Sequence, residues 1–337
     1  MRVPLSWPET FGTRFTIFVD VEEEFDWSAP LSADNRAVTA VSELPKADGR
    51  LRDLGAVPAY LVDYPVAVAP GAIEVMRELV ARPGGEIGAQ LHPWVNPPFT
   101  EEASAGHGFV GNLPEANEAA KLQALTAAIT AAVGVAPRVY RAGRYGIGPN
   151  TFALLAAQGY RLDTSMRARF DYRADGGPSF AGIGNHAFRA GPSGRVVELP
   201  LTTAFTGALR RGGPALYPRL ASSRIARGLL ARTGLLSRVP LTPEGVPVQE
   251  ALEAVRVALG EGTQVLNFAF HSPSLVPGHT PYVRDAADLG RFYGWWDAML
   301  QLLARRGVAG TSTADLVSAS SLASEGAAPL SRRTRGL

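Results

Sequence analysis

The stretch FTIFVDVEEEFDW, residues 15–27, decides the fold because it joins a buried strand to a run of acids. It begins as a short apolar run rich in β-branched residues, which is typical of a buried strand. The acids that follow are Asp20, Glu22, Glu23, Glu24 and Asp26. Asp20 and Glu22 are two positions apart, so they share one face of an extended chain. Carboxylates at the C-terminal end of a strand hold metal ions or act as general bases in many α/β enzymes.

Further apolar segments have strand character, and helical segments separate them. The expected strands are 15–21, 57–62, 86–92, 138–143, 160–165, 196–201 and 263–271, with a short one near 308–312. The expected helices are 36–54, 70–82, 115–133, 149–158, 247–260 and 285–306. This alternation of strands and helices predicts an α/β fold with a parallel sheet or barrel.

The composition narrows the class of protein. A hydrophobic content of 46% can fill a sizeable core, and a net charge of +2 gives no reason to expect a nucleic-acid partner. The absence of cysteine excludes disulfides, thiolate metal sites and cysteine nucleophiles. No apolar run approaches about 18 residues, so no membrane span is expected. The first residues lack a charged region followed by an apolar one, so we expect no signal peptide and a cytoplasmic location.

Residues 204–243 interrupt the alternation, with seven arginines and no acid. The leucine, isoleucine and alanine residues between the arginines indicate a basic amphipathic helix within an insertion. A lid over the site, a clamp for an anionic ligand, a membrane-surface contact and a solvated insertion all remain open as roles. The Ser/Ala/Gly-rich residues 318–337 predict a disordered tail, which leaves residues 1–317 as a single domain.

Reactive side chains stand at or just after the ends of several expected strands. They are Asp20 and Glu22, His92 with Asn96 four residues later, Arg141, Asp163 and His271. The C-terminal ends of parallel strands meet on one face of a barrel, so these groups should converge there. Glu22 and His92 offer an oxygen and an imidazole ligand, which suit Zn²⁺ or another divalent ion. Asn96 could supply a third, weaker oxygen ligand.

The residue types also predict a reaction. Asp20 beside a bound ion could act as general base on a water molecule, with Arg141 holding the carboxylate ionised. His271 is a candidate general acid, and Asp163 could fix its tautomer and raise its pKa. Backbone N–H groups of the turn 143–146 could bind an oxyanion. Together these groups predict a metal-assisted amide or ester hydrolase.

The order of these motifs resembles that of the NodB-homology polysaccharide deacetylases, carbohydrate esterase family four, from about residue 15 to residue 312. The strings DVEEEFDW, EIGAQLHPWVNPP, YRAGRYG, LDTSM and FHSPSLVPGHTPY are most similar to a WalW-like subgroup. The resemblance implies a distorted (β/α) barrel of about seven parallel strands. It also implies hydrolysis of an N-acetyl or O-acetyl group on a sugar or polysaccharide.

The resemblance implies a role for each matched residue. By its motif, Asp20 would be the general base, Arg141 would support that base, and Glu22 and His92 would be metal ligands. His271 would be the general acid, and Asp163 would tune its pKa.

Three departures from the family pattern stand out. Asn96 occupies the place of the second metal histidine, and Gln90 is an alternative neighbour of the ion. The second acid of the first motif is displaced by one position and lengthened to Glu22. The arginine motif reads RAGRYG, so the oxyanion donor becomes the N–H of Arg144 or Tyr145. One imidazole in place of two should weaken metal binding.

Three functions are compatible with these residues. The leading one is a metal-dependent deacetylase acting on an acetylated sugar. The second is a metal-independent hydrolase of C–N bonds, including those of cyclic amides, which the altered metal motif permits. The third is a catalytically silent carbohydrate-binding protein, although pure binding needs neither a base nor an acid. Trp27 and Trp94 adjoin the motifs and could form sugar-stacking walls, whereas Glu23, Glu24 and Asp26 are expected to be solvated or supporting charges.

Overall fold

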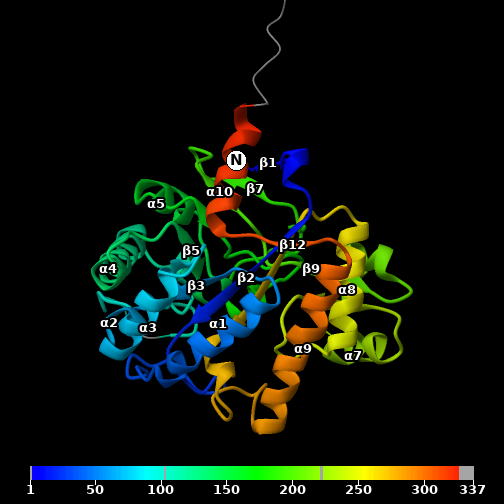
Figure 1. Cartoon of the computed structure of the whole chain (residues 1–337), viewed down its shortest axis with the longest axis horizontal. Helices are drawn as coiled ribbons and strands as arrows, with labels where there is room; N and C mark the ends of the chain where they lie inside the picture. Colours follow the sequence, from blue (N-terminus) through cyan, green and yellow to red (C-terminus); the bar gives the residue numbers. More distant parts are fainter. Residues whose placement is uncertain (1, 102–103, 221–222, 326–337) are drawn as a thin grey trace, which may run out of the picture.

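A mostly parallel sheet forms the centre of the computed structural model, which describes residues 2–101, 104–220 and 223–325 (Figure 1). Its parallel strands follow the order β8-β6-β5-β4-β3-β2-β11. They are β2 (Arg14–Val21), β3 (Pro58–Val62), β4 (Glu86–Leu91), β5 (Val139–Ala142), β6 (Leu162–Asp163), β8 (Val196–Glu198) and β11 (Val265–His271). Each lies within a predicted strand or extends it by one residue, so the predicted α/β fold with about seven parallel strands is confirmed.

Short strands complete the sheet, and its two ends approach each other. β1 (Val3–Pro4) and β7 (Phe188–Ala190) add antiparallel pairings at one edge, and β12 (Ala309–Gly310) pairs with β2. The ladders form an open path within the described residues. The N–H of Thr202, just beyond β8, nevertheless donates to the carbonyl of Asn267 in β11 at 3.1 Å. The amide of Asn267 in turn donates to the carbonyl of Leu199 at 2.9 Å. These bonds curl the sheet around its interior.

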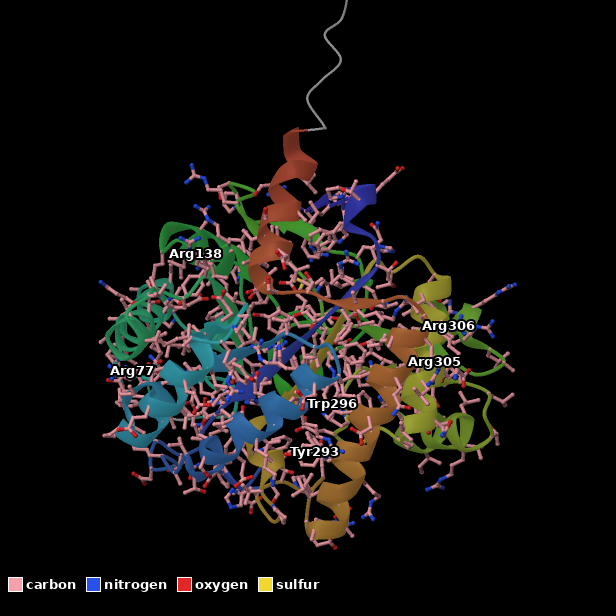
Figure 2. The ribbon with its side chains drawn as sticks, in the orientation of Figure 1. Arg77, Arg138, Tyr293, Trp296, Arg305 and Arg306 are labelled. Atoms are coloured by element: carbon pink, nitrogen blue, oxygen red, sulfur yellow. The ribbon has the colours of Figure 1, made fainter. Side chains whose placement is uncertain are left out.

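Helices cover the outer face of this curled sheet (Figure 1). They are α1 (Leu44–Asp53), α2 (Tyr64–Val68), α3 (Pro70–Val80), α4 (Glu115–Val133), α5 (Thr151–Ala157), α8 (Val248–Gly260) and α9 (Ala286–Arg305). Every predicted helix is present, and α2 is an addition. Trp296, labelled on α9 in Figure 2, shows how they pack: it is 1% exposed, and its ring lies 6.0 Å from Phe268 and 5.6 Å from Phe270 of β11.

Side chains alternate between two cores along each strand. On β2, Ile17 and Val19 belong to the core that packs beneath the helices, whereas Phe18 belongs to an interior cluster that includes Leu61 of β3. Asp20 lies two residues beyond Phe18, so it also faces the interior. The same alternation therefore brings inward-facing polar groups together at the C-terminal ends of the strands.

Helix α10 (Thr313–Glu325) closes the opposite end of the interior, beside β1 and β7 (Figure 1). Its Leu316 and Ala319 are buried in the interior cluster together with Trp7. The composition had predicted disorder from residue 318 onward, but these apolar side chains, three residues apart, give the segment one face to bury. The structure thus differs from the prediction over residues 318–325, while 326–337 lie outside the described residues.

The basic segment forms a structured insertion on a β-hairpin. β9 (Thr203–Thr206) pairs with β10 (Ser237–Pro240), and α6 (Gly213–Arg219) and α7 (Arg224–Arg232) lie between them. The expected basic amphipathic helix corresponds to α7. Within the described part of the chain, no helix combines the length and the hydrophobicity that a membrane span requires.

Candidate active site

A cavity of about 690 Å³ lies at the C-terminal ends of the parallel strands. The residues that line it include Asp20 of β2 and Glu22 just after it, Gln90 of β4 and His92 just after it, Arg141 of β5 and His271 of β11. The strand register explains why they meet. His271 is opposite Asp20 in the β11–β2 ladder, and Gln90 is opposite Arg141 in the β4–β5 ladder. The structure therefore brings together most of the side chains that the strand-end argument selected.

Asp20 and Arg141 form a buried ion pair at the base of the cavity. Nη1 of Arg141 donates to Oδ1 of Asp20 at 2.6 Å, and the two side chains are only 1% and 2% exposed. Thr164 fixes the guanidinium through its carbonyl and its hydroxyl, each at 3.1 Å. The arginine supplies the counter-charge that a buried carboxylate requires. Because only Oδ1 makes this bond, Oδ2 remains available on the side of His271.

His271 faces Asp20 across the cavity and is held from behind by Glu244. Nε2 of His271 lies 3.5 Å from Oδ2 of Asp20, whereas Nδ1 lies 2.7 Å from Oε2 of Glu244. Burial lowers the pKa of His271, but the carboxylates of Glu244 and Glu22 outweigh it and raise that pKa to about 10. The ring is therefore protonated at neutral pH. An imidazolium whose Nε2–H faces the cavity is suited to general acid catalysis.

The partner of His271 is thus Glu244, and the prediction that Asp163 fixes this histidine was wrong. Leu162 of β6 belongs to the interior cluster, and the hydroxyl of Thr164, the residue after β6, accepts a bond from Arg141. Strand alternation therefore turns Asp163 outward. There Asp163 lies opposite Glu198 in the β6–β8 ladder. Burial raises the pKa of both carboxyl groups, and neither lines the cavity, so we assign the pair to a structural contact.

Glu244 was missed because it follows no predicted strand. It lies in the turn between β10 and α8, where its carboxylate accepts bonds from the N–H of His271 at 3.0 Å and the hydroxyl of Ser274 at 2.6 Å. The one available signal was that Glu244 is the first acid after the acid-free segment 204–243.

Three polar groups meet on the other side of Asp20. Nε2 of Gln90 lies 2.9 Å from Oε2 of Glu22 and 3.1 Å from Nε2 of His92. The last two atoms are 3.6 Å apart. Burial raises the pKa of Glu22 to about 7 and lowers the pKa of His92. A carboxyl oxygen, an imidazole nitrogen and an amide thus converge on one point of the cavity wall.

A second set of carboxyl groups supports His92 from behind. Oε2 of Glu23 lies 2.8 Å from Nδ1 of His92, and the indole of Trp94 donates to Oε1 of Glu23 at 2.6 Å. Asp63 accepts the backbone N–H of Glu23 at 2.8 Å. Glu23, Asp63 and His92 form a buried Glu/Asp/His group whose ligand atoms all lie within 4.8 Å of one another. Glu23, which had been expected to be a solvated or supporting charge, is fully buried in this supporting role.

The protonation of Glu23 decides the tautomer of the histidine. Burial raises the pKa of Glu23 to about 8 and that of Asp63 well above its ordinary value. When Glu23 is ionised, a proton on Nδ1 of His92 satisfies the bond between them and leaves the lone pair of Nε2 facing Gln90 and Glu22.

Asn96 does not reach the cavity, so its prediction as a third metal ligand was wrong. The N–H of Asn96 donates to the carbonyl of His92 at 3.1 Å, which closes one helical turn and directs Asn96 toward α4. Its amide then donates to the carbonyl of Lys121 at 2.9 Å, and the Lys121 ammonium returns a bond to the Asn96 carbonyl at 2.7 Å. Gln90, on the inward face of β4, lies where the missing ligand was expected.

The two tryptophans near the motifs have different environments. The ring of Trp27 lines the cavity 5.0 Å from the ring of His271. Its Nε1 is buried with no hydrogen-bond partner among the described residues, so it can donate to a bound molecule. Trp94 also borders the cavity, but it is 7% exposed and stacks on His92 at 4.3 Å. Trp94 therefore supports the histidine, and Trp27 is the better candidate for a sugar-stacking wall.

A strained turn follows β5 at the edge of the cavity. Arg144 and Tyr145 line the cavity and have left-handed backbone conformations, with φ of 55° and 60°. Such conformations are uncommon for residues other than glycine and often occur at functional sites. The preceding residue, Gly143, packs against the histidine: a Cβ there would lie 2.2 Å from Cδ2 of His92. The turn thus holds its backbone next to the convergent polar groups.

Comparisons with known proteins show the fold. No family model and no curated protein sequence matches this chain. A Mycobacterium smegmatis structure, described as that of a polysaccharide deacetylase, aligns with a TM-score of 0.53 and 18% identity, over 97% of this chain and 96% of that one. The 4-alpha-glucanotransferase of Thermococcus litoralis aligns with a TM-score of 0.51 and 12% identity, over 91% of this chain and 40% of that one. A family 4 carbohydrate esterase from Streptomyces lividans aligns with a TM-score of 0.43 and 10% identity, over 88% of this chain and 91% of that one.

Proposed function

We propose that this protein is a hydrolase that removes an acetyl group from a nitrogen or an oxygen of a sugar or polysaccharide. The observation that carries the proposal is the pairing of Asp20 with His271 across 3.5 Å, with each side chain held by an oppositely charged partner. The resemblance of the motifs to NodB-homology deacetylases, and to their WalW-like subgroup, supports it. The fold shared with the Mycobacterium smegmatis structure is consistent with it.

The geometry suggests a separate catalytic role for each of these groups. Oδ2 of Asp20 takes the proton from a water molecule as that water attacks the acetyl carbonyl. Backbone N–H groups of the turn at Arg144 and Tyr145 stabilise the oxyanion that develops. His271, protonated at neutral pH, then donates the proton on Nε2 to the leaving nitrogen or oxygen. Arg141 and Glu244 position the base and the acid, respectively, through bonds of 2.6 and 2.7 Å.

The wall formed by Glu22, His92 and Gln90 has a donor set that fits a divalent ion. Two ligands of a tetrahedral Zn²⁺ lie about 3.4 Å apart for bonds of about 2.0–2.1 Å, and Glu22 and His92 are 3.6 Å apart. Oε1 of Gln90 is buried without a hydrogen-bond partner among the described residues. Rotation of the amide by half a turn directs this oxygen to the same point. We therefore propose Glu22, His92 and Gln90 as the residues that would hold Zn²⁺ or another divalent ion.

A bound divalent ion would supply Lewis acidity, which polarises the acetyl carbonyl and lowers the pKa of water. Burial lowers the pKa of His92, which favours the neutral ring, and with Glu23 ionised a proton on Nδ1 leaves Nε2 free to coordinate. The buried Glu23–Asp63 pair stands behind the ring and does not line the cavity, so we assign it to orientation of the histidine.

One observation favours the metal-independent alternative. In the amide orientation described above, Nε2 of Gln90 donates to both Glu22 and His92, so one neutral amide satisfies the two acceptors that an ion would otherwise neutralise. Such a site would suit hydrolysis of a C–N bond, including that of a cyclic amide, without an ion. Elemental analysis of the purified protein, before and after dialysis against Zn²⁺, separates the two forms of the proposal.

Acetate release from a panel of N-acetylated and O-acetylated oligosaccharides tests the reaction. Asp20→Asn and His271→Ala should each lower kcat by roughly 10²- to 10⁴-fold on any substrate that the wild type turns over. Asp163→Asn is a matched control, because its carboxyl group lies on the outward face of β6. Unchanged turnover in both site variants, with a folded control, would overturn the assignment of base and acid.

A further inference from the structure

Arg167 is a positive charge on the cavity wall that lacks an acidic partner. It lines the active-site cavity, and its Nε is buried with no hydrogen-bond partner among the described residues. No carboxylate in the described ranges lies within ion-pair distance of its guanidinium, in contrast to Arg141, which pairs with Asp20. The neighbours that most favour its charged form are the tyrosines Tyr172 and Tyr145. A half-buried guanidinium without a counter-ion is costly, so Arg167 is poised to receive an anion.

A second arginine continues this positive charge away from the cavity. The guanidinium of Arg167 lies 4.0 Å from the ring centre of Phe170, and that of Arg238 lies 3.5 Å from the same ring centre. Two groups this close to one ring must lie on its opposite faces. Nε of Arg238 is also buried without a partner in the described part of the chain. Burial, together with repulsion from Arg167, lowers the pKa of Arg238 to about 10.

On the far side of Phe170 lies a second cavity of about 790 Å³. Arg238 and Arg227 line it, and both belong to the basic insertion. Other arginines of this cavity already have acidic partners, as Arg173 has in Asp171 at 2.7 Å. A row of guanidiniums with aromatic neighbours thus runs from the active-site cavity into the insertion. Among the open roles of residues 204–243, this arrangement favours a clamp for an anionic ligand.

We propose that the substrate is an acidic glycan whose sugar carboxylates bind Arg167 beside the acetylated sugar and Arg238 farther along the chain. This inference rests on the proposed deacetylase function and names its substrate class. Guanidinium groups bind carboxylates through paired, charge-assisted hydrogen bonds, and aromatic faces stack on sugar rings. Nη1 of Arg238 donates to the carbonyl of Arg169 at 2.9 Å, but neither guanidinium has an anionic partner among the described residues. A neutral glycan would leave both without a counter-charge, whereas uronate sugars would supply one to each.

Binding of two matched oligosaccharides tests the inference, in an Asp20→Asn background that prevents turnover. Heparosan hexasaccharide alternates N-acetylglucosamine with glucuronate, whereas chitohexaose contains N-acetylglucosamine alone. By isothermal titration at 50 mM NaCl, heparosan should bind about tenfold or more tightly than chitohexaose. Arg167→Gln and Arg238→Gln should each reduce that ratio severalfold, because each removes a partner of a heparosan carboxylate. Arg50→Gln, which removes a surface arginine paired with Asp297, should preserve the ratio.

Equal affinities for the two probes, including no measurable binding of either, would overturn the inference, as would a ratio that neither arginine variant changes. If Arg167→Gln does not fold, Arg167→Lys and the salt dependence of the parent protein serve instead: rising NaCl should weaken heparosan binding alone. Acetate release by the wild-type enzyme distinguishes failure of the acidic-substrate inference from failure of the proposed deacetylase function. Turnover of both probes without preference retains the deacetylase and removes the acidic substrate. Preferential binding of heparosan without acetate release retains the acidic ligand and removes the deacetylase function.

Discussion

Replacing Glu244 by glutamine should remove the charge that keeps His271 protonated. The pKa of His271 is about 10 in the folded protein against an ordinary value of 6.5, and Glu244 is the largest contribution that raises it. An opposite charge in direct contact shifts a pKa by about one to three pH units, and His271 is 21% exposed, which screens part of this effect. We expect a fall of about two pH units, to a pKa near 8, equivalent to roughly 3 kcal/mol.

The sign of the stability change follows from the raised pKa. His271 stabilises the fold fully below its unfolded-state pKa of about 6.5, and this contribution is lost as the pH rises through about 10. Glu244→Gln should therefore lower the free energy of unfolding at pH 6 to 8 and have little effect near pH 10. The alkaline limb of kcat should move down by the same two pH units, because the variant loses its general acid earlier.

Proton NMR titration of the His271 ring, assigned by comparison with His271→Gln, measures this pKa directly. Asp163→Asn is the decisive control, since it removes the carboxylate that sequence motifs favoured but that lies on the opposite face of β6. The reasoning fails if Asp163→Asn lowers the pKa of His271 by about two pH units while Glu244→Gln leaves it unchanged.

Three further perturbations test other parts of the molecule. Arg141→Met leaves the buried carboxylate of Asp20 without its counter-charge, so urea denaturation should show a loss of about 3–5 kcal/mol. Gln90→Glu adds a second carboxylate to the proposed ion site and should raise Zn²⁺ affinity at least tenfold in competition with a chelating dye. Burial raises the pKa of Glu118 from an ordinary value of 4.5 to about 7, so the fold loses stability as the pH rises from about 4.5 through about 7 and the carboxyl group ionises. Glu118→Gln should therefore gain roughly 3 kcal/mol over wild type between pH 5 and pH 8.

Each of these outcomes has a contradicting result and a control. Unchanged stability of Arg141→Met would show that Asp20 is compensated elsewhere. Unchanged Zn²⁺ affinity in Gln90→Glu would remove that residue from the ion site, and Asn96→Ala should affect stability without affecting affinity. A constant difference between Glu118→Gln and wild type at all pH values would show that its carboxyl group does not titrate in this range.

The sequence predicted where the strands end better than which way their side chains point. Each predicted strand and helix is present because apolar periodicity and turn residues are local properties of the chain. Asp20, Arg141 and His271 could be selected together because the ends of parallel strands share one edge of the sheet. Asp163 was misassigned because which face of β6 points inward follows from its pairing with β5 and β8, and the sequence alone does not show that pairing.

The remaining errors involve tertiary contacts. Asn96 was placed by its spacing from His92, but one helical turn after β4 directs the side chain to α4. Glu244 contacts His271 from a turn that follows the insertion. No local sequence pattern predicts that the chain comes back to the active site at this turn. The helical course of residues 318–325 depends on burial of Leu316 and Ala319 against Trp7, which is distant in the sequence.

The close packing of Gly143 against His92 has a practical consequence for engineering. A methyl group at position 143 would overlap the imidazole ring and the backbone carbonyl of Leu91, at 2.2 and 2.8 Å. Gly143→Ala should therefore tilt the ring while leaving every acid, base and ligand chemically intact. Such a variant would be an inactive form that retains the native charge and surface. It would therefore suit the capture of bound partners without conversion.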